Sequence, residues 1–415
     1  PHRPAAEGVE SGRWAGDVWI VALTEMTLGA SYVLAGRSSE AIEILSRALL
    51  AFRECGDSFG RAAARLWLSL AYLDLHQGEH FASGVEDLLA LCETHGYHFL
   101  FTAPTLLGPP DPRRLVPLLL EARARKRRPA YAARLLADLG LPDIQMHPGY
   151  QLRLQTLGAF RAWRGDVEIE PREWRRDKAR QLFQLFITQR DRQFQREEIT
   201  EILWPDLTPE AAIRDFKVAL NALNKVLEPN RPADAPFAFI VREGSTYFLR
   251  PDADLWLDVA AFERECETGL RLAESAGELS AASPLETAIS HLQSAIQLYR
   301  GDYLPDAIYE RWASEEREHL LTLYLRAADK LAGSLLERGQ TDECLKVCQL
   351  ILARDTCWER AYRLMMAAYA QQGNRPQALR VYQRCVDVLR DELDVAPSPE
   401  TNTLHERIAQ SGERP

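Results

Sequence analysis

The clearest pattern of hydrophobic and polar positions lies in residues 208–229, TPEAAIRDFKVALNALNKVLEP. Thr208 is a preferred N-cap residue, Pro209 suits the first helical position, and Pro229 cannot continue a helix, so we predict a helix between them. Its apolar residues recur every three or four positions and form one face: Ile213, Phe216, Leu220, Leu223 and Leu227. The opposite face carries basic, amide and small apolar side chains: Arg214, Val218, Asn221, Ala222 and Lys225. A face that only met solvent would usually carry Glu and Lys throughout, so this one is a candidate for binding.

Strand-like and helix-like patterns alternate around this helix. Residues 152–160 and 167–171 show the alternation of short, half-buried strands. Residues 179–189 and 194–206 have helical spacing, and residues 237–251 read as a hairpin with a Glu-Gly-Ser-Thr turn. Strands, three helices and a hairpin in this order predict a winged helix-turn-helix preceded by a small sheet.

Helical repeats are indicated on both sides of this segment. Four glycines are each followed by a small residue five positions later and, except at Ile351, by a second one seven positions further on: Gly36–Ala41–Ala48, Gly78–Ser83–Ala90, Gly339–Cys344–Ile351 and Gly373–Ala378–Cys385. Gly339 and Gly373 are 34 residues apart, which is the tetratricopeptide period. Small facing side chains let antiparallel helices approach closely, so we expect helical hairpins at these glycines.

These patterns predict a mainly α chain with a small α+β domain: a winged helix-turn-helix flanked by two tetratricopeptide-like α-solenoid segments. We expect a helical-repeat domain over residues 1–145, the winged helix over residues 150–254, and a second helical-repeat domain over residues 255–415. A stretch rich in Gly and Pro, residues 140–150, marks the first boundary.

Charge narrows the choice of binding surface. The chain has 415 residues and a net charge of −10, which argues against a uniformly basic binder of nucleic acid. Residues 151–250 carry a net charge of +2, whereas the rest of the chain carries −12. Only the middle segment is therefore expected to face a polyanion, and only through a local patch.

Neither catalysis nor metal binding is indicated by motifs. The sequence contains no GxxxxGK[ST] P-loop, HExxH, nucleophile elbow, dinucleotide fingerprint or zinc quartet, so we expect no enzyme, cofactor or metal site. The seven cysteines lack the paired spacing of a disulfide framework, and Cys344 and Cys348 are expected to be buried core residues. With no run of 18 apolar residues and no signal peptide, we expect a cytoplasmic protein that does not enter the membrane.

Several ordered motifs carry a resemblance to a known family. LRLQTLGAF (152–160), EEITEILWPD (197–206), DLWLDVAAFE (254–263), RGDYLPD (300–306) and DVAPSPETNTL (394–404) occur in the order found in SARP-type bacterial transcriptional activators. That family joins an OmpR-type winged helix to a bacterial transcriptional activator domain, here expected over residues 255–415. Residues 1–140 resemble, more loosely, the helical repeats of large MalT-like regulators.

The resemblance implies that residues 209–227 form the recognition helix, which lies in the DNA major groove. Its basic side chains suit phosphates or guanine edges, its Asn suits adenine, and its Val and Ala suit thymine methyl groups. The candidate contacts are Arg214, Lys217, Val218, Asn221, Ala222 and Lys225. Lys217 and, in addition, Asn224 flank this face and are weaker candidates. Many members carry an Arg pair where this chain has Asn224 and Lys225, which implies fewer phosphate contacts and a smaller salt dependence.

Other basic clusters lie outside this helix. Arg175, Arg176 and Lys178 precede or begin the first helix of the winged domain, where they either contact phosphates or remain solvated. By resemblance, Arg242 and Thr246 at the wing turn are expected to contact the minor groove or the backbone. The run at residues 121–129, EARARKRRP, is expected to be a solvated helix end or to pair with acidic repeats.

Three functional hypotheses follow. The first is an activator that binds double-stranded DNA and RNA polymerase, as a monomer or a homodimer, with repeats that sense a signal or bind partners. The second is a repeat scaffold whose winged domain serves protein contacts. The third is the output half of a signalling ATPase, with the ATPase module upstream in the same chain.

Overall fold

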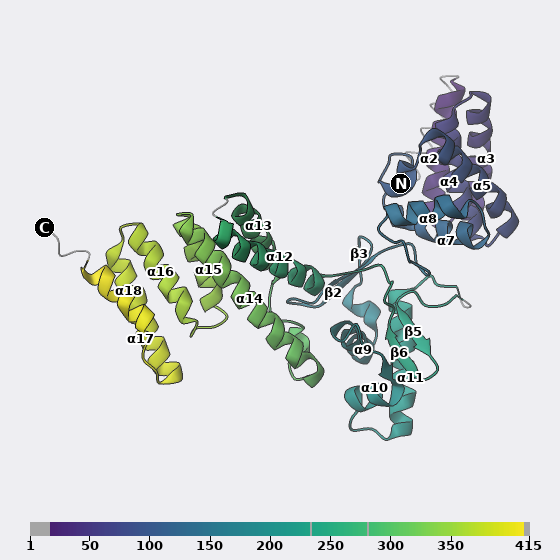
Figure 1. The fold of residues 1–415 in the computed structure, drawn as a ribbon. Coiled ribbons are helices and arrows are strands. Elements are labelled where there is room, and N and C mark those ends of the chain that lie inside the picture. The colour runs from purple at the N-terminus through teal and green to yellow at the C-terminus, as the bar shows by residue number, and fades with distance from the viewer. Residues whose placement is uncertain (1–16, 233–234, 280–281, 411–415) are drawn as a thin grey trace. The chain divides into compact units, whose positions relative to one another are not determined.

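The structure is a computed structural model that describes residues 17–232, 235–279 and 282–410 (Figure 1). The chain forms two compact units, of which one comprises residues 1–152 and 163–255. The other comprises residues 153–162 and 256–415. Within the described residues, no helix combines the length and the apolar character needed to cross a lipid bilayer.

The first unit begins with helices that pack in sequence, each against the next, from α2 to α5. These helices are α2 (Val18–Leu34), α3 (Ser38–Glu54), α4 (Ser58–Asp74), α5 (Gly78–His95), α6 (Phe99–Thr102), η1 (Pro112–Leu115), α7 (Val116–Ala124) and α8 (Pro129–Asp138). The prediction of helical hairpins before residue 140 is therefore confirmed.

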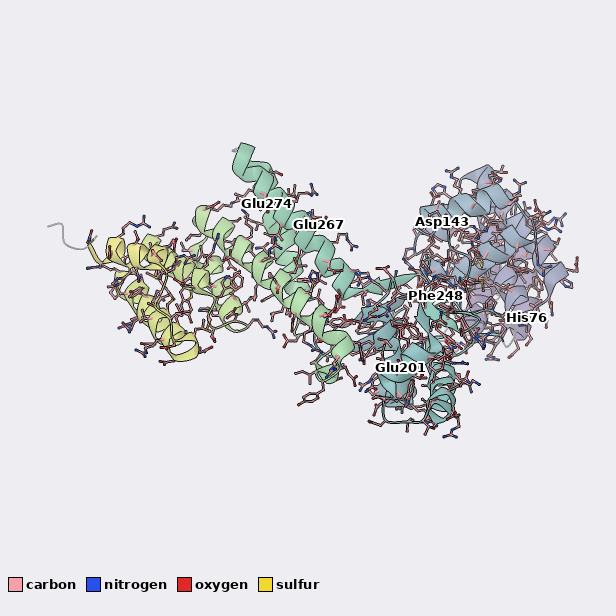
Figure 2. All side chains as sticks on the ribbon, turned by 60° about the horizontal axis from the view of Figure 1, so that its bottom comes forward. His76, Asp143, Glu201, Phe248, Glu267 and Glu274 are labelled. Carbon is pink, nitrogen blue, oxygen red and sulfur yellow. The ribbon has the colours of Figure 1, made fainter. Side chains whose placement is uncertain are left out.

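The spacing of glycines and small residues holds in three of the four predicted places. Gly36, Gly339 and Gly373 all adopt positive φ in a turn, and the positions five and twelve residues later are fully buried in each case. In the remaining turn, His76 (labelled in Figure 2) takes the positive φ, while Gly78 starts α5. The buried pair there is Phe81 and Leu88, so the register predicted from Gly78 is wrong by two residues.

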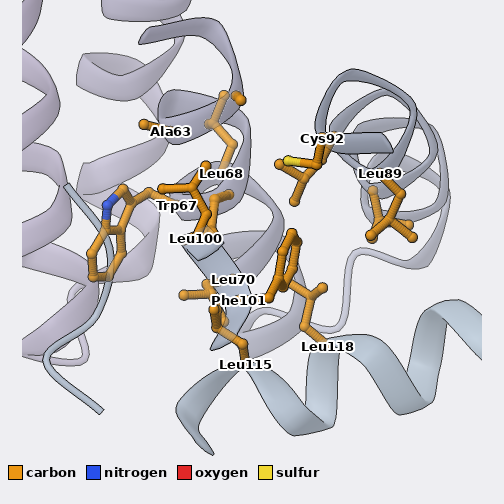
Figure 3. Packing of buried hydrophobic residues seen from close by; sticks show 14 of the residues in the cluster. Ala63, Trp67, Leu68, Leu70, Leu89, Cys92, Leu100, Phe101, Leu115 and Leu118 are labelled. Atoms are coloured by element: carbon orange, nitrogen blue, oxygen red, sulfur yellow. The ribbon is translucent and has the colours of Figure 1, made fainter. Parts of the chain in front are cut away.

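One hydrophobic core connects these helices. The short helix α6 contributes Leu100 and Phe101, which are buried among side chains of α5, η1 and α7 (Figure 3). Cys92 lies in the same cluster, and burial raises the pKa of its thiol to about 12. This thiol is therefore a small apolar core residue rather than a reactive group.

The middle of the chain contains the three predicted helices, α9 (Asp177–Thr188), α10 (Arg196–Leu203) and α11 (Pro209–Leu227), with α11 packed on the other two. A three-stranded sheet with the order β4-β6-β5 accompanies them. Its strands are β4 (Phe194–Gln195), β5 (Ile240–Glu243) and β6 (Thr246–Leu249). The hairpin prediction is confirmed, but Phe194 is not helical, because β4 pairs with β6 before α10 begins.

A second sheet has the order β3-β2-β1-β7. Its strands are β1 (Leu152–Gln155), β2 (Arg161–Arg164), β3 (Val167–Glu168) and β7 (Leu255–Leu257). The predicted strand at 152–160 thus ends at Gln155, and the one at 167–171 ends at Glu168, before a 3₁₀ turn, η2 (Pro171–Trp174). The pattern also missed β2, which has only one buried residue, Ala162.

The second unit is a further stack of helices. It contains α12 (Asp258–Leu279), α13 (Ala282–Leu298), η3 (Pro305–Ala307), α14 (Arg311–Glu337), α15 (Thr341–Leu352), α16 (Glu359–Gln371), α17 (Arg375–Leu393) and α18 (Pro399–Gln410). Each α-helix packs against the next, as a solenoid requires. Cys344 and Cys348 are fully buried there, and the described residues contain no metal-binding cluster of His, Cys, Asp and Glu.

Asp258, the first residue of α12, is a buried carboxylate to which no basic side chain of the described residues donates. It accepts from the backbone N of Thr156 (2.8 Å), Leu157 (2.9 Å) and Val259 (2.9 Å), and from the Thr156 hydroxyl (2.7 Å). Burial raises the pKa of Asp258, and these hydrogen bonds offset part of that effect. Within the second unit, one side chain thus fixes the chain after β1 to the start of α12.

We predict that Asp258→Ala lowers the free energy of unfolding by roughly 2–5 kcal/mol, because buried N–H groups lose their acceptor. Glu267→Ala is the matched control, since Glu267 is an exposed carboxylate on the same helix (Figure 2) and its loss should cost less than about 0.5 kcal/mol. Urea unfolding followed by circular dichroism measures both variants. Equal midpoints for the two would contradict the role given to Asp258.

Candidate nucleic-acid interface

Helix α11 begins where its sequence predicts. Thr208 caps it by accepting a hydrogen bond from Ala211 N (3.4 Å), and Pro209 occupies the first turn. Its buried residues are Ala212, Phe216, Ala219, Leu223, Asn224, Val226 and Leu227. Ile213 and Leu220, predicted for the core face, are only half-buried. Small residues face inward instead, because α11 packs closely on α9 and α10.

The outward face of α11 keeps most of its predicted members. Five of the six predicted contacts are exposed: Arg214, Lys217, Val218, Asn221 and Lys225. Ala222 is half-buried, and Asn224 is buried with 7% exposure, so it cannot reach a groove from this face. Val218 is 37% exposed, which leaves an apolar side chain in the middle of a polar surface.

The basic groups on this face are weakly neutralised. Arg214 is 74% exposed, and its Nε lies 3.9 Å from Asp215 Oδ1, which is a loose contact that solvent screens. No carboxylate of the described residues pairs with Lys217 or Lys225. The face therefore presents three cations together with an amide and a small apolar side chain.

Aromatic rings fix the inner side of α11. The Phe216 ring lies edge-on to Trp204, which follows α10, with centroids 6.4 Å apart, and edge-on to Tyr247 of β6 at 4.9 Å. These contacts connect the turn before α11, the helix itself and the wing strand. Edge-to-face pairs favour one geometry, so the outward face is held in a defined orientation.

Lys178 supports this packing rather than facing solvent. Its Nζ donates to the Leu203 carbonyl (2.6 Å) at the end of α10 and lies 5.7 Å from the centroid of the Trp204 ring. A lysine at a helix C-terminus satisfies a carbonyl that has no partner within the helix. The prediction that Lys178 contacts phosphate therefore conflicts with where the structure places its ammonium group. Arg175 and Arg176, just before α9, are exposed.

The wing is the turn between β5 and β6. Arg242 is exposed, its Nε donates to the Gly244 carbonyl (3.0 Å), and its guanidinium lies 5.9 Å from the Tyr247 ring centroid. Thr246 is half-buried and accepts from the Gln195 amide (2.9 Å), which also accepts from the Ser245 hydroxyl (2.9 Å). No local pattern predicts this role of Gln195, because nothing in the sequence connects a residue before α10 with a turn about 50 residues later.

The basic run at residues 121–129 has structural partners. Arg128 pairs with Glu86 and Glu93 of α5, and Arg125 pairs with Glu121. Arg128 thus pairs with acidic residues of the repeats, which is one of the two alternatives expected for this run, and α11 with the wing remains the main candidate surface.

Comparisons with known proteins agree with this architecture. Residues 257–409 match the family model of the bacterial transcriptional activator domain. The regulatory protein AfsR of Streptomyces coelicolor is 27% identical over 272 residues, which are 66% of this chain and 25% of AfsR. The regulatory protein DnrI of Streptomyces peucetius is 25% identical over 262 residues, 63% of this chain and 93% of DnrI.

A solved structure shows the same fold. Mycobacterium tuberculosis EmbR, determined in complex with a low-affinity phosphopeptide, superposes with a TM-score of 0.52 at 20% identity, over 63% of this chain and 66% of EmbR. The fold thus defines a winged-helix protein with tetratricopeptide-like repeats. The activator-domain match and the named regulators make this chain similar to SARP-type transcriptional regulators. The matched region spans only a quarter of AfsR, so the activity of that whole protein does not transfer directly.

We predict that substitution on the inner side of α11 lowers the stability of the protein, whereas substitution on its outer side does not. Phe216→Ala should lower the free energy of unfolding by about 3–5 kcal/mol, because it empties a site between two aromatic rings. Val218→Asp should change it by less than about 0.5 kcal/mol, because the side chain is exposed and lies one turn after Arg214. Thermal melting of both variants tests this assignment. A large loss of stability in Val218→Asp would mean that the assigned outer face is buried.

Proposed function

We propose that this protein is a sequence-specific regulator that binds double-stranded DNA and activates transcription. Helix α11 enters the major groove, and the β5–β6 turn contacts the adjacent backbone or minor groove. The observation that supports this most is the outward face of α11, where cations without close carboxylate partners surround an amide and an exposed valine. A face that served only solubility would usually carry Glu and Lys throughout.

The side chains of this face have different roles in the proposal. Asn221 reads an adenine edge through its amide, and Val218 and the half-buried Ala222 pack against thymine methyl groups. The basic groups bind phosphates or guanine edges and set the register: Arg214, Lys217, Lys225, Arg175, Arg176 and Arg242. Thr246 positions the wing turn through Gln195.

The rest of the chain supplies partners in this proposal. The winged helix, residues 150–254, binds DNA, while the repeats of residues 1–145 and 255–415 bind proteins through stacked helices. RNA polymerase is the partner that activation requires, and a homodimer would give two half-sites on DNA. An ATPase module in the same chain would supply signal input, and the protein would act in the cytoplasm, where bacterial DNA is.

We predict that binding to duplex DNA weakens steeply with salt. With four to six phosphate contacts per protomer, the slope of log K against log salt should be roughly −4 to −5, and Lys225→Ala should make it shallower by about one. Fluorescence anisotropy at several salt concentrations measures both slopes. A slope near zero for the parent chain would favour the protein scaffold over the DNA-binding regulator.

We predict that Asn221→Ala costs about 1–3 kcal/mol on the preferred site and relaxes preference at one base pair. The reason is that the amide makes a base contact, whereas Lys225 contacts phosphate. Titrations of Asn221→Ala and Lys225→Ala against duplexes substituted at each position compare the two variants. An Asn221→Ala chain that weakens on all sequences alike would show that Asn221 does not read a base.

A further inference from the structure

The C-terminal end of α11 is held by side chains from outside the helix. The last carbonyls of a helix have no partner within it and need one elsewhere. The Tyr150 hydroxyl donates to the Leu227 carbonyl (2.6 Å), and Arg164 Nη1 donates to the Val226 carbonyl (2.7 Å). Just beyond, the Glu228 carboxylate accepts from Ala238 N (2.9 Å). The end of the helix that carries Lys225 is therefore fixed by long-range contacts.

Tyr150 belongs to the segment that connects α8 with β1, and this segment is anchored on Asp254. His147 Nε2 lies 3.2 Å from Asp254 Oδ2, and Gln151 Nε2 donates to Asp254 Oδ1 (2.7 Å). His147 Nδ1 accepts from Gly149 N (3.0 Å), so the ring carries its proton on Nε2 and donates it to the carboxylate. Tyr150 is thus placed by residues on both sides of it.

The same carboxylate binds the N-terminal helices. Arg113 of η1 donates through Nε to Asp254 Oδ2 (2.5 Å). Burial alone would raise the pKa of Asp254, but the three side chains that donate to it hold that pKa below its ordinary value. The carboxylate therefore stays charged near neutral pH and keeps its attraction for the guanidinium.

We propose that Tyr150 is a positioning residue for α11, through which the N-terminal helices act on the helix that faces DNA. Displacement of Arg113 from Asp254 loosens the segment around Tyr150, and the Leu227 carbonyl at the end of α11 then loses its donor. The DNA part of this inference rests on the proposed function, whereas the coupling itself is a property of the free protein.

Tyr150→Phe is the variant that tests the cap, because it removes only the hydroxyl. Tyr131→Phe is its matched control, since Tyr131 is a buried tyrosine of the same unit whose hydroxyl has no hydrogen-bond partner among the described residues. We expect Tyr150→Phe to speed amide hydrogen exchange at residues 225–228 in the full chain without DNA. Tyr131→Phe should leave that exchange unchanged.

Arg113→Gln tests whether the coupling reaches the N-terminal helices. It should speed exchange over the same residues, and the double variant with Tyr150→Phe should show less than the sum of the two effects, because both act on one path. Unchanged exchange in Tyr150→Phe or in Arg113→Gln, or full additivity, would overturn the inference.

Duplex binding separates this inference from the proposed function. Tyr150→Phe should weaken binding to the preferred duplex by about 3- to 10-fold, as expected for one hydrogen bond, because binding must then order the loosened turn. Its salt slope should match the parent, since no phosphate contact is removed. A parent chain that binds no duplex would refute the proposed function, while the exchange data would still decide the coupling.

Discussion

Two buried carboxylates, Asp254 and Asp258, flank the short strand β7, and each is surrounded by hydrogen-bond donors from other segments of its own unit. Asp254 gathers Arg113, His147 and Gln151 within the first unit. Asp258 accepts from the backbone N–H groups that follow β1 and from Val259 N in the first turn of α12, within the second unit. A buried carboxylate is tolerated only when donors surround it, so each aspartate fixes the position of the segments that supply those donors.

Within the first unit, this constraint extends to the surface that faces DNA in our proposal. The segment anchored on Asp254 carries Tyr150, which caps α11, and the inner face of α11 is fixed between Trp204 and Tyr247. Binding then requires little ordering of the helix, which favours affinity and specificity. In our proposal the N-terminal helices also help to fix α11, because their Arg113 binds Asp254, which anchors the segment that carries Tyr150.

The sequence was informative where local patterns decide structure. The cap at Thr208, the helical spacing of α11, the hairpin of β5 and β6, and the turns at Gly36, Gly339 and Gly373 were all predicted and confirmed. It was misleading where tertiary packing decides. Asn224 is buried because α11 is rotated towards its small residues, and His76 replaces the expected glycine in its turn. The partners of Lys178, Gln195 and Tyr150 join residues 25 or more positions apart, for which a single sequence carries no signal.

The central claim is that the outward face of α11 meets the DNA groove. Titration of a duplex from a promoter region of its own genome with the parent chain and with Val218→Asp tests this claim most directly. A carboxylate at position 218 would face phosphates and base edges, so the account predicts that the variant melts like the parent and loses specific binding. A variant that melts like the parent and binds as tightly would contradict the account, because α11 would then lie outside the groove.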